Sequence, residues 1–328
     1  MKSVFLDRDG TLNKDDGYVH KVEDFELYDD VIPSLQRLKD FALFIVTNQS
    51  GVGRGYYTKE QVHAFNDHLL DELKKHKIAI RKVYSCCHHP DEKCECRKPG
   101  TLFVEQAKKE FGVTLEQSWT IGDHDVDILL AKNTGMSSVL VLTGHGAKHL
   151  EESRKANPEY IAANLEQATT FILFDQDKKI IPRENIGKVA QAEKKKGKSV
   201  VTLNGTFDIL HKGHEKIIKE AKKQGDVLIV AINSDSSVRA NKGPSRPYNN
   251  EKARAKMIAA FSEVNYVTSF SEKTPVELLE EIKPNVHVNG SEYGKDCIEA
   301  PTVKKHGGRV HIVELIKGLS TSNMVKQQ

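Results

Sequence analysis

Short apolar runs of strand length alternate with helical patterns along the first half of the chain. The runs predict strands at Ser3–Leu6, Ala42–Val46, Lys82–Tyr84, Trp119–Ile121 and Val139–Leu142, and the patterns between them include helices at Thr58–His76 and Thr101–Phe111. Strands that alternate with helices indicate a parallel α/β sheet. Ligands of such sheets bind beyond the carboxyl ends of the strands, so polar residues at those ends are candidates for chemistry.

A second α/β alternation follows a polar stretch. It predicts strands at Val200–Leu203, Val227–Ile232, Tyr266–Thr268, Val286–Val288 and Val310–Val313, and helices at Gly213–Gln224, Asn250–Ala260 and Pro275–Ile282. Before it, Asn164–Phe174 is predicted as a closing helix and strand. We expect an N-terminal domain over residues 1–174, a linker with a leading helix over 175–198, and a C-terminal domain over 199–328. The halves share no motif, which indicates a fusion of two different domains.

Composition and charge narrow the class of protein. A chain of 328 residues is long enough for two domains of about 150 residues each. Its formal net charge of +3 is too small to indicate a nucleic-acid or membrane partner. No run approaches the ~20 apolar residues of a membrane span, and Met1 leads into a predicted strand without a signal-peptide layout. A cytoplasmic protein is therefore expected.

Carboxylates, a hydroxyl and a cation follow the strands of the first half. Asp7 and Asp9 stand two residues apart at a strand end, so both can point into one crevice, and Thr47, Lys98 and Asp123 follow later strand segments. Hydrolysis of a phosphate monoester needs a nucleophile, an acid for the leaving oxygen, a cation and usually a divalent metal. An isolated Asp-x-Asp is most often a capped turn, but four such elements in this order favour Asp7 as nucleophile and Asp9 as acid and base.

Four of the five cysteines fall within eleven residues, which favours a metal over disulfide bridges. Cys86-x-His88-x5-Cys94-x-Cys96 offers three thiolates and an imidazole, the ligands of a closed tetrahedral zinc site. Cys87 and His89 are competing ligands. Four protein ligands leave no open position, so this Zn²⁺ is predicted to be structural.

These residues resemble the haloacid dehalogenase (HAD) phosphatase superfamily, whose motifs appear as Asp7-x-Asp9-Gly10-Thr11, Thr47-Asn48, Lys98 and Gly122-Asp123-x3-Asp127. Gly17–His20, Thr47–Gly55 and Cys96–Pro99 are similar to the subfamily that removes the C7 phosphate of D-glycero-D-manno-heptose 1,7-bisphosphate. Histidinol-phosphate phosphatases share this scaffold and zinc loop.

The resemblance also implies roles for individual residues. Mg²⁺ would bind the Asp7 carboxylate, the Asp9 backbone carbonyl and Asp123, while the substrate would contact Thr47, Asn48, Arg54 and Arg97, and the family pattern selects Cys86 and His88 as zinc ligands. Asp127 either orients Lys98 or the metal's water, or is an N-terminal helix carboxylate. His124 stands where the heptose enzymes usually carry lysine.

A second phosphate-handling motif follows the first strand of the second half. Asn204-Gly205-Thr206-Phe207-Asp208 leads into His211-Lys212-Gly213-His214 at the start of a predicted helix. Backbone N–H groups at a helix start suit phosphate, and His211 and His214, three residues apart, place two rings on one side of that helix. A lone His-x-x-His would be ordinary helix surface, but the preceding strand and turn make this motif specific.

The stretch resembles the cytidylyltransferase-like superfamily through its His-x-Gly-His motif. From about residue 178 to 328 the resemblance sharpens to the adenylyltransferase of the ADP-heptose pathway, through Val230–Asp235, Lys242–Pro247, Arg254 and Ser320–Asn323; Asn289–Tyr293 departs from that family's Lys-Gly-Gly-Asp-Tyr. It implies that His211 and His214 stabilise the transition state, with nucleotide contacts from Thr206, Phe207, Lys222, Arg246, Arg254, Ser320, Thr321 and Ser322. Glycerol-phosphate cytidylyltransferases share some of these elements, so CTP stays an alternative to ATP.

The two resemblances together imply a bifunctional enzyme with two Rossmann-like parallel-sheet domains. It would convert heptose 1,7-bisphosphate into heptose 1-phosphate, then transfer AMP from ATP to give ADP-heptose and pyrophosphate. Sugar phosphates and ATP are the expected partners, together with a homodimer through the C-terminal domain. The alternatives are a polyol-phosphate phosphatase fused to a CTP-dependent enzyme for capsule precursors, and a nucleotide-sensing regulator on a degenerate scaffold, which the intact Asp7/Asp9 and His211/His214 pairs disfavour.

Overall fold

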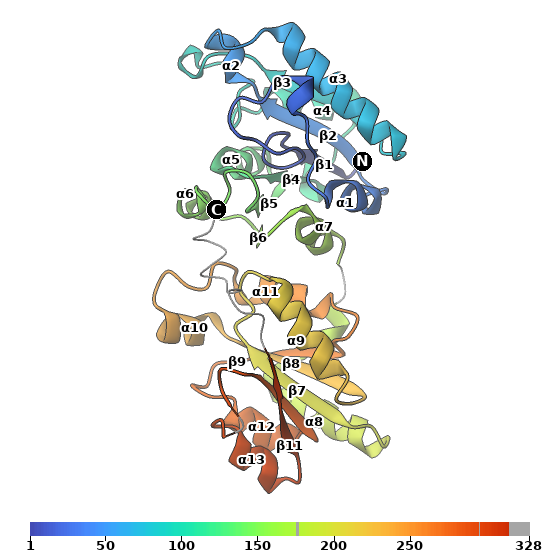
Figure 1. Ribbon diagram of the computed structural model, residues 1–328, viewed down its shortest axis with the longest axis vertical. Helices are drawn as coiled ribbons and strands as arrows, with labels where there is room; N and C mark the ends of the chain where they lie inside the picture. Colours follow the sequence, from blue (N-terminus) through green and yellow to red (C-terminus); the bar gives the residue numbers. More distant parts are fainter. Residues whose placement is uncertain (175–176, 295, 315–328) are drawn as a thin grey trace. The chain divides into compact units, whose positions relative to one another are not determined.

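A computed structural model describes residues 1–174, 177–294 and 296–314, and the chain divides into two compact units, Met1–Leu173 and Phe174 onward. Each unit holds one parallel sheet with helices between its strands (Figure 1). The expected pair of parallel α/β domains is therefore confirmed. Among the described residues, no helix is both long enough and apolar enough to cross a membrane.

The first unit is built on six strands in the order β3-β2-β1-β4-β5-β6. Its strands are β1 (Ser3–Leu6), β2 (Ala42–Asn48), β3 (Ile80–Cys86), β4 (Trp119–Gly122), β5 (Ser137–Val141) and β6 (Tyr160–Ala162). Its helices are α1 (Val31–Arg37), α2 (Ser50–Gly53), α3 (Lys59–Lys75), α4 (Leu102–Phe111), α5 (Asp125–Thr134), α6 (Leu150–Lys155) and α7 (Leu165–Leu173). β1 is buried along its whole length, as expected of a central parallel strand covered on both faces.

One expected element of this unit is wrong. Asn164–Phe174 was predicted to hold a helix followed by a strand, but α7 runs to Leu173, and the edge strand β6 lies before that helix. β6 has only three residues, too few for a period-2 pattern to appear in the sequence.

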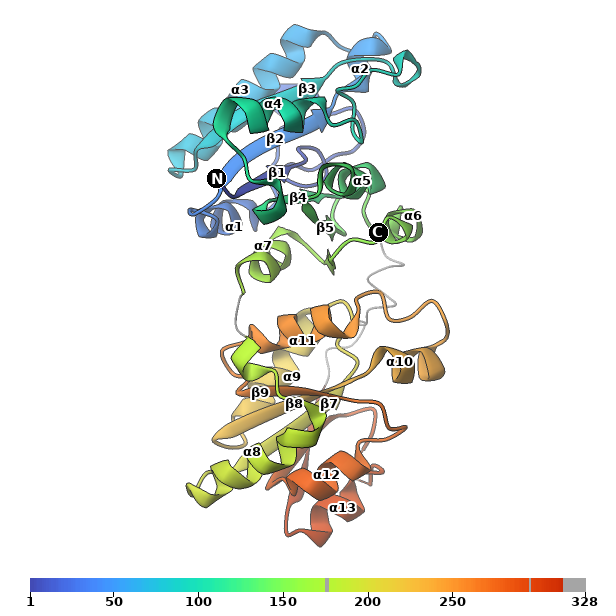
Figure 2. The same cartoon turned by 180° about the vertical axis from the view of Figure 1, so that it is seen from behind.

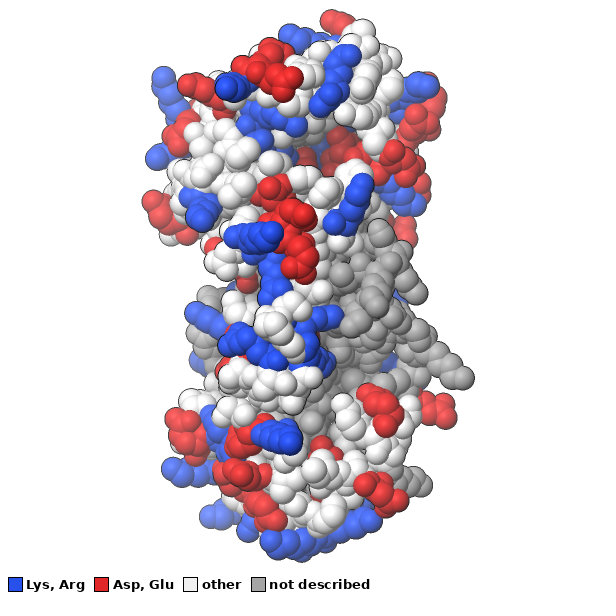
Figure 3. Space-filling model, turned by 90° about the vertical axis from the view of Figure 1, so that its left-hand side faces the viewer, with Lys and Arg blue, Asp and Glu red and all other residues white. Residues whose placement is uncertain are grey.

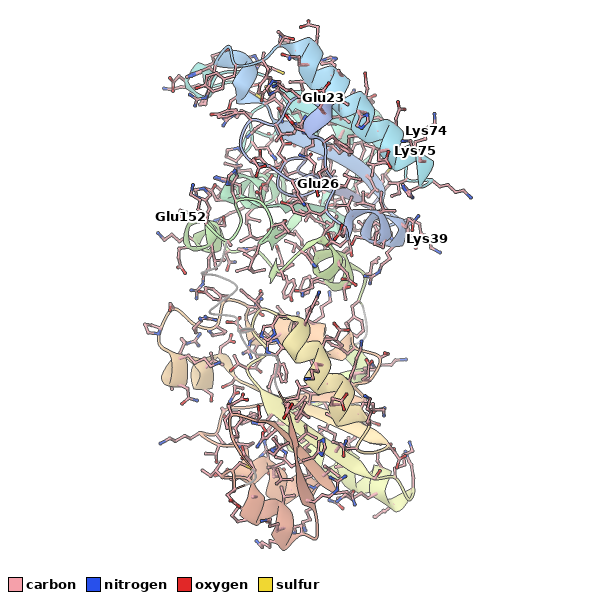
Figure 4. All side chains as sticks on the ribbon, viewed as in Figure 1. Glu23, Glu26, Lys39, Lys74, Lys75 and Glu152 are labelled. Atoms are coloured by element: carbon pink, nitrogen blue, oxygen red, sulfur yellow. The ribbon has the colours of Figure 1, made fainter. Side chains whose placement is uncertain are left out.

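Helices cover both faces of the first sheet. α4 and α5 pack on one face through Val104, Ala107, Leu130 and Ala131, and stand in front in Figure 2. α1 and α7 contact each other on the opposite face, seen in front in Figure 1. Figure 4 shows Lys74 and Lys75 at the carboxyl end of α3, where cations favour the helix dipole. Figure 3 shows basic and acidic side chains interspersed over one face of this unit.

The second unit has five strands in the order β11-β10-β7-β8-β9. Its strands are β7 (Val200–Gly205), β8 (Val227–Asn233), β9 (Tyr266–Phe270), β10 (Val286–Gly290) and β11 (Arg309–Val313). Its helices are α8 (Arg183–Lys195), α9 (Lys212–Lys222), α10 (Asp235–Lys242), α11 (Glu251–Ala259), α12 (Val276–Ile282) and α13 (Ala300–Lys305). α8, the leading helix, is part of the core because Ile186 and Ala190 pack on the sheet.

Candidate functional site

Three carboxylates meet at the carboxyl ends of β1 and β4 in the first unit. Asp7 directly follows β1, Asp123 directly follows β4, and Asp127 lies in the first turn of α5; one oxygen of each lies within 4.8 Å of the others. The backbone N–H of His145 donates to Asp123 Oδ2 at 2.7 Å and so fixes that carboxylate. Gly10 allows the close approach, because a Cβ there would lie 2.1 Å from Asp123 Oδ2.

Lys98 is the cation of this cluster. Its buried ammonium lies 2.8 Å from Asp7 Oδ1 and 2.6 Å from Asp127 Oδ1. Asn48 holds the Lys98 backbone on both sides, accepting from its N–H at 2.9 Å and donating to its carbonyl at 3.3 Å. Asp127 Oδ2 also accepts from the His124 N–H at 3.3 Å. Asp127 thus fills both roles considered for it, orienting Lys98 and capping α5.

The electrostatics of the cluster favour a further cation. Burial raises the pKa of Asp7 to about 7, with Lys98 opposing and Asp127 adding to the rise. Burial also raises the pKa of Asp123, and the nearby charge of Asp7 adds to that rise. Burial works to lower the pKa of Lys98, but Asp127 and Asp7 outweigh it and raise that pKa. One ammonium therefore balances three crowded carboxyl groups incompletely, and this oxygen donor set suits a divalent cation.

Asp9 is held by side chains that sequence reasoning did not select. Arg8 forms a two-pronged pair with it, Nε to Oδ1 and Nη2 to Oδ2, each at 2.8 Å. Asn13 Nδ2 donates to Oδ1 at 3.0 Å, and Gln49 Nε2 donates to Oδ2 at 2.7 Å. The Tyr57 hydroxyl in turn donates to Gln49 Oε1 at 2.9 Å. The one available signal was that Gln49 lies within the Thr47–Gly55 string and Tyr57 two residues beyond it.

The expected substrate contacts lie beside this cluster with different degrees of exposure. Thr47 is buried at the end of β2 and accepts from Gln49 Nε2 at 2.8 Å. Arg97, next to Lys98, has a buried Nη1 without a hydrogen-bond partner. A buried guanidinium nitrogen of this kind can donate to an anionic ligand. Arg54 is exposed at the end of α2.

The cysteine loop brings its four expected ligands together. Cys86 ends β3, and its Sγ lies 3.2 Å from Cys96 Sγ, 3.5 Å from Cys94 Sγ and 3.6 Å from His88 Nδ1. Tetrahedral zinc with Zn–S bonds of ~2.3 Å spaces its ligands by roughly 3.5–3.8 Å. The donor set and spacing therefore fit Zn²⁺. Gly53 lets α2 approach the loop, because a Cβ there would lie 2.3 Å from the His89 nitrogen.

In the second unit, His211 and His214 lie at the start of α9, after the five-residue turn that follows β7. Their rings stack with centroids 3.8 Å apart, and His211 Nδ1 accepts from the Gly213 N–H at 3.2 Å. Burial lowers the pKa of His214 to about 3, with His211 adding to the effect, and its Nδ1 is buried without a partner. His214 is thus neutral at physiological pH, and its unpartnered ring nitrogen can serve a ligand.

A cavity of about 720 Å³ opens over these rings. Thr206, Phe207, Lys242 and Arg246 are among its lining residues. Buried Asp208 fixes one wall, because it accepts from Arg246 Nη1 at 3.0 Å and from the Tyr248 and Asn249 N–H groups at 2.9 Å. The wall is therefore basic and held in place, as a polyphosphate site requires.

Two basic residues expected at the nucleotide lie elsewhere. Arg254 is fully buried and donates to Thr206 O at 2.7 Å, Asn249 O at 3.0 Å and Asp235 Oδ1 at 2.7 Å. It supports the turn that carries Thr206. Lys222 ends α9, where it donates to Asn265 Oδ1 at 2.9 Å and does not line the cavity. Ser320, Thr321 and Ser322 lie outside the described residues.

Family models match a part of each half. A cytidylyltransferase-like model matches residues 202–324, and a HAD-hydrolase-like model matches residues 95–168. The chain thus joins a HAD-like unit to a cytidylyltransferase-like unit, as the motifs indicated.

Individual relatives agree with both matches. A probable D-glycero-D-manno-heptose-1,7-bisphosphate 7-phosphatase from Thermoplasma acidophilum is 43% identical over 139 residues, which cover 42% of this chain and 87% of that protein. The bifunctional protein HldE of Syntrophotalea carbinolica is 40% identical over 169 residues, covering 50% of this chain and 34% of that protein. The chain thus spans about a third of the length of this HldE relative. The D,D-heptose 1,7-bisphosphate phosphatase of B. bronchiseptica, solved with magnesium and phosphate, superposes with a TM-score of 0.50 at 28% identity, over 53% of this chain and 98% of that one.

Proposed function

The chain belongs to the D-glycero-D-manno-heptose-1,7-bisphosphate 7-phosphatase family, and on that premise we propose a bifunctional enzyme of nucleotide-activated heptose synthesis. The first unit removes the C7 phosphate of heptose 1,7-bisphosphate. The second transfers AMP from ATP to the resulting heptose 1-phosphate, releasing pyrophosphate. The observation that carries the proposal is the Asp7–Lys98–Asp127 cluster, in a chain that is 43% identical over 139 residues to a probable heptose phosphatase.

In the first step, an Asp7 carboxylate oxygen attacks phosphorus and the C7 oxygen leaves with a proton from Asp9. Asp9 then takes a proton from the water that hydrolyses the aspartyl phosphate, which regenerates both carboxyl groups. Lys98 stabilises the charge on the transferring group and keeps Asp7 in place. Thr47, Asn48, Arg54 and Arg97 complete the proposed substrate contacts, of which the unpartnered Arg97 Nη1 is the best supported.

The residues present fit two metals. Asp7, Asp123 and the Asp9 carbonyl would hold Mg²⁺, which neutralises phosphate charge when bound. Cys86, His88, Cys94 and Cys96 would hold a structural Zn²⁺, supported by the distances of 3.2–3.6 Å from Cys86 Sγ to the other three ligand atoms. The zinc loop leads directly into Arg97 and Lys98, so its metal would fix the position of both.

In the second unit, the sugar phosphate attacks the α-phosphorus of ATP in line, and the protein supplies position and charge neutralisation without a nucleophile. His211 and His214 would contact the reacting phosphate, assisted by Thr206, Phe207 and Arg246. Arg254 acts through the Thr206 turn. Lys222, Ser320, Thr321 and Ser322 stay predicted nucleotide contacts on resemblance alone. We also propose a cytoplasmic enzyme that forms a homodimer through its second unit.

The test is a two-substrate assay on the full chain. Heptose 1,7-bisphosphate should yield one phosphate per sugar, and the product should release pyrophosphate with ATP at least ~tenfold better in kcat/KM than with CTP, a barrier difference of about 1.4 kcal/mol. A preference for CTP with polyol phosphates would support the capsule-precursor alternative, and phosphate release from histidinol phosphate alone would reject the heptose assignment.

Matched variants separate the two activities. Asp9→Asn should abolish phosphate release while nucleotidyl transfer to supplied heptose 1-phosphate continues. His214→Ala should abolish nucleotidyl transfer while phosphate release continues. Loss of both activities in either folded variant would contradict two independent sites.

A further inference from the structure

A buried carboxylate lines the β10 side of the second unit's cavity. Glu299, just before α13, and Asn289, near the end of β10, are 5% and 3% exposed and both line the cavity. Asn289 Nδ2 donates to Glu299 Oε2 at 3.3 Å, a long bond that satisfies the carboxylate weakly. The Cys297 thiol also lies within hydrogen-bonding reach of both side chains.

Strand order places this pair away from the basic wall. β7 lies between β8 and β10, and Lys242 and Arg246 come from the segment after β8. The chain runs from β7 outward to β9 and then crosses back to β10, so the carboxyl ends of β7 and β10 flank the switch point of the sheet, where ligands of such folds bind. The cavity therefore has a cationic side and a carboxylate side.

The charge on each side of the cavity determines which ligand groups can bind there. Phosphates suit the Lys242 and Arg246 side, and the same phosphates would be repelled by Glu299. Over the described ranges of the chain, no lysine or arginine forms an ion pair with Glu299, although a buried carboxylate needs donors. The Asn289 amide and the Cys297 thiol leave acceptor capacity on the two carboxylate oxygens, so a neutral ligand group that donates hydrogen bonds fits this side.

We propose that Glu299 and Asn289 bind neighbouring hydroxyls of a sugar in a substrate of the second unit. Two hydroxyls donate to the carboxylate oxygens, and the Asn289 amide can both donate and accept. The proposal rests on the nucleotidyl transfer proposed above and makes this pair a specificity determinant of that reaction. The hydroxyls belong either to the acceptor sugar or to the ribose of the nucleotide.

The test couples a protein variant to a substrate lacking one hydroxyl. Pyrophosphate release and equilibrium binding are measured for wild type, Glu299→Ala and Glu299→Gln, with ATP, 2′-deoxy-ATP and 3′-deoxy-ATP in one arm, and with heptose 1-phosphate and a deoxy-sugar 1-phosphate in the other. Glu299→Ala should lower kcat/KM about 10- to 100-fold, as expected for hydrogen bonds to a charged group. Glu299→Gln should fall between Ala and wild type.

The variant also shows whether the hydroxyls belong to the ribose or to the acceptor sugar, because only the matching deoxy substrate should lose its binding difference from its parent. In wild type, the deoxy substrate that lacks the contacted hydroxyl should bind more weakly than its parent substrate. In Glu299→Ala, the same deoxy substrate and its parent should bind equally well. This loss of the difference is expected in either the ribose arm or the acceptor arm. A merely structural Glu299 would weaken all substrates alike. Glu277→Gln, an exposed carboxylate on α12 that does not line the cavity, is the control and should stay within about twofold.

Two failures are distinguishable. The hydroxyl site is wrong if wild type turns over and Glu299→Ala has the same kcat/KM. It is also wrong if the deoxy substrates still bind more weakly than their parents to Glu299→Ala in both arms. Either result leaves the proposed reaction in place. A wild type that binds neither nucleotide nor sugar phosphate overturns both.

Discussion

The Lys98 ammonium lies 2.8 Å from Asp7 Oδ1. Its only other carboxylate partner among the described residues is Asp127. Because removing one partner of a buried pair leaves uncompensated charge, Lys98→Met should lower kcat for phosphate release at least ~100-fold and destabilise the first unit by about 3 kcal/mol.

The assay is phosphate release, with unfolding followed by the fluorescence of Trp119, the chain's single tryptophan. Lys82→Met, which removes a surface pair with Glu110, is the control and should change neither value appreciably. Near-normal turnover in Lys98→Met would rule out a role for this ammonium in the chemistry.

A second prediction concerns the Tyr57–Gln49–Asp9 chain. Gln49→Ala removes a 2.7 Å donor from Asp9 and leaves the Tyr57 hydroxyl unpaired. We expect kcat for phosphate release to fall about tenfold, or ~1.4 kcal/mol, with KM nearly unchanged, because the chain orients the acid and not the substrate. Tyr57→Phe should show a smaller fall, and exposed Tyr56→Phe none. A rise in KM at constant kcat would instead indicate substrate contact.

The sequence predicted the parts of the fold that repeat a pattern. Strands such as β1, β2 and β8 are continuous apolar runs, and their carboxyl ends carry Asp7, Thr47 and Asn233. Short elements were missed because they show no period: three-residue β6 and six-residue α13 have too few positions for one.

The sites show the same division. Asp7, Lys98 and Asp123 could be predicted because each follows a strand segment, whereas the Gln49–Asp9 contact joins residues 40 apart in sequence. The sequence predicted Arg254 as a phosphate ligand, but its partners include the backbone carbonyls of Thr206 and Asn249. Every residue has a backbone carbonyl, so a sequence cannot indicate which carbonyls will accept from an arginine.

The zinc loop gives the third prediction. Metal analysis of protein purified without chelators should find about one zinc per chain, and Cys96→Ser should lose it, lower the Trp119 unfolding midpoint and reduce phosphate release, because the loop carries Arg97 and Lys98. Cys87→Ser is the matched control, since this neighbouring thiol is outside the ligand cluster, and it should keep the metal. Zinc retained in full by Cys96→Ser would exclude this site.

The last prediction is a pH dependence of the second unit. Burial lowers the pKa of His214 to about 3 and that of His287 to about 4, the latter against an opposing effect of Glu299. Histidine in an unfolded chain titrates near ~6.5, so below that pH the unfolded state binds protons that the folded state excludes. The stability contribution is therefore present above about pH 6.5 and lost on acidification, by about 2 kcal/mol per histidine between pH 7.5 and 5.

His287 offers the cleaner test because it does not line the cavity. His287→Leu should remove about 2 kcal/mol of the pH dependence, although the variant loses the 2.8 Å contact with Thr202 Oγ1 and starts less stable. Urea unfolding followed by circular dichroism reports both units, and Trp119 fluorescence identifies the transition of the first, so the second can be assigned by difference. Exposed His63→Gln on α3 should leave the pH dependence unaltered. If His287→Leu keeps the wild-type slope between pH 7.5 and 5, burial of this imidazole does not cause the acid sensitivity.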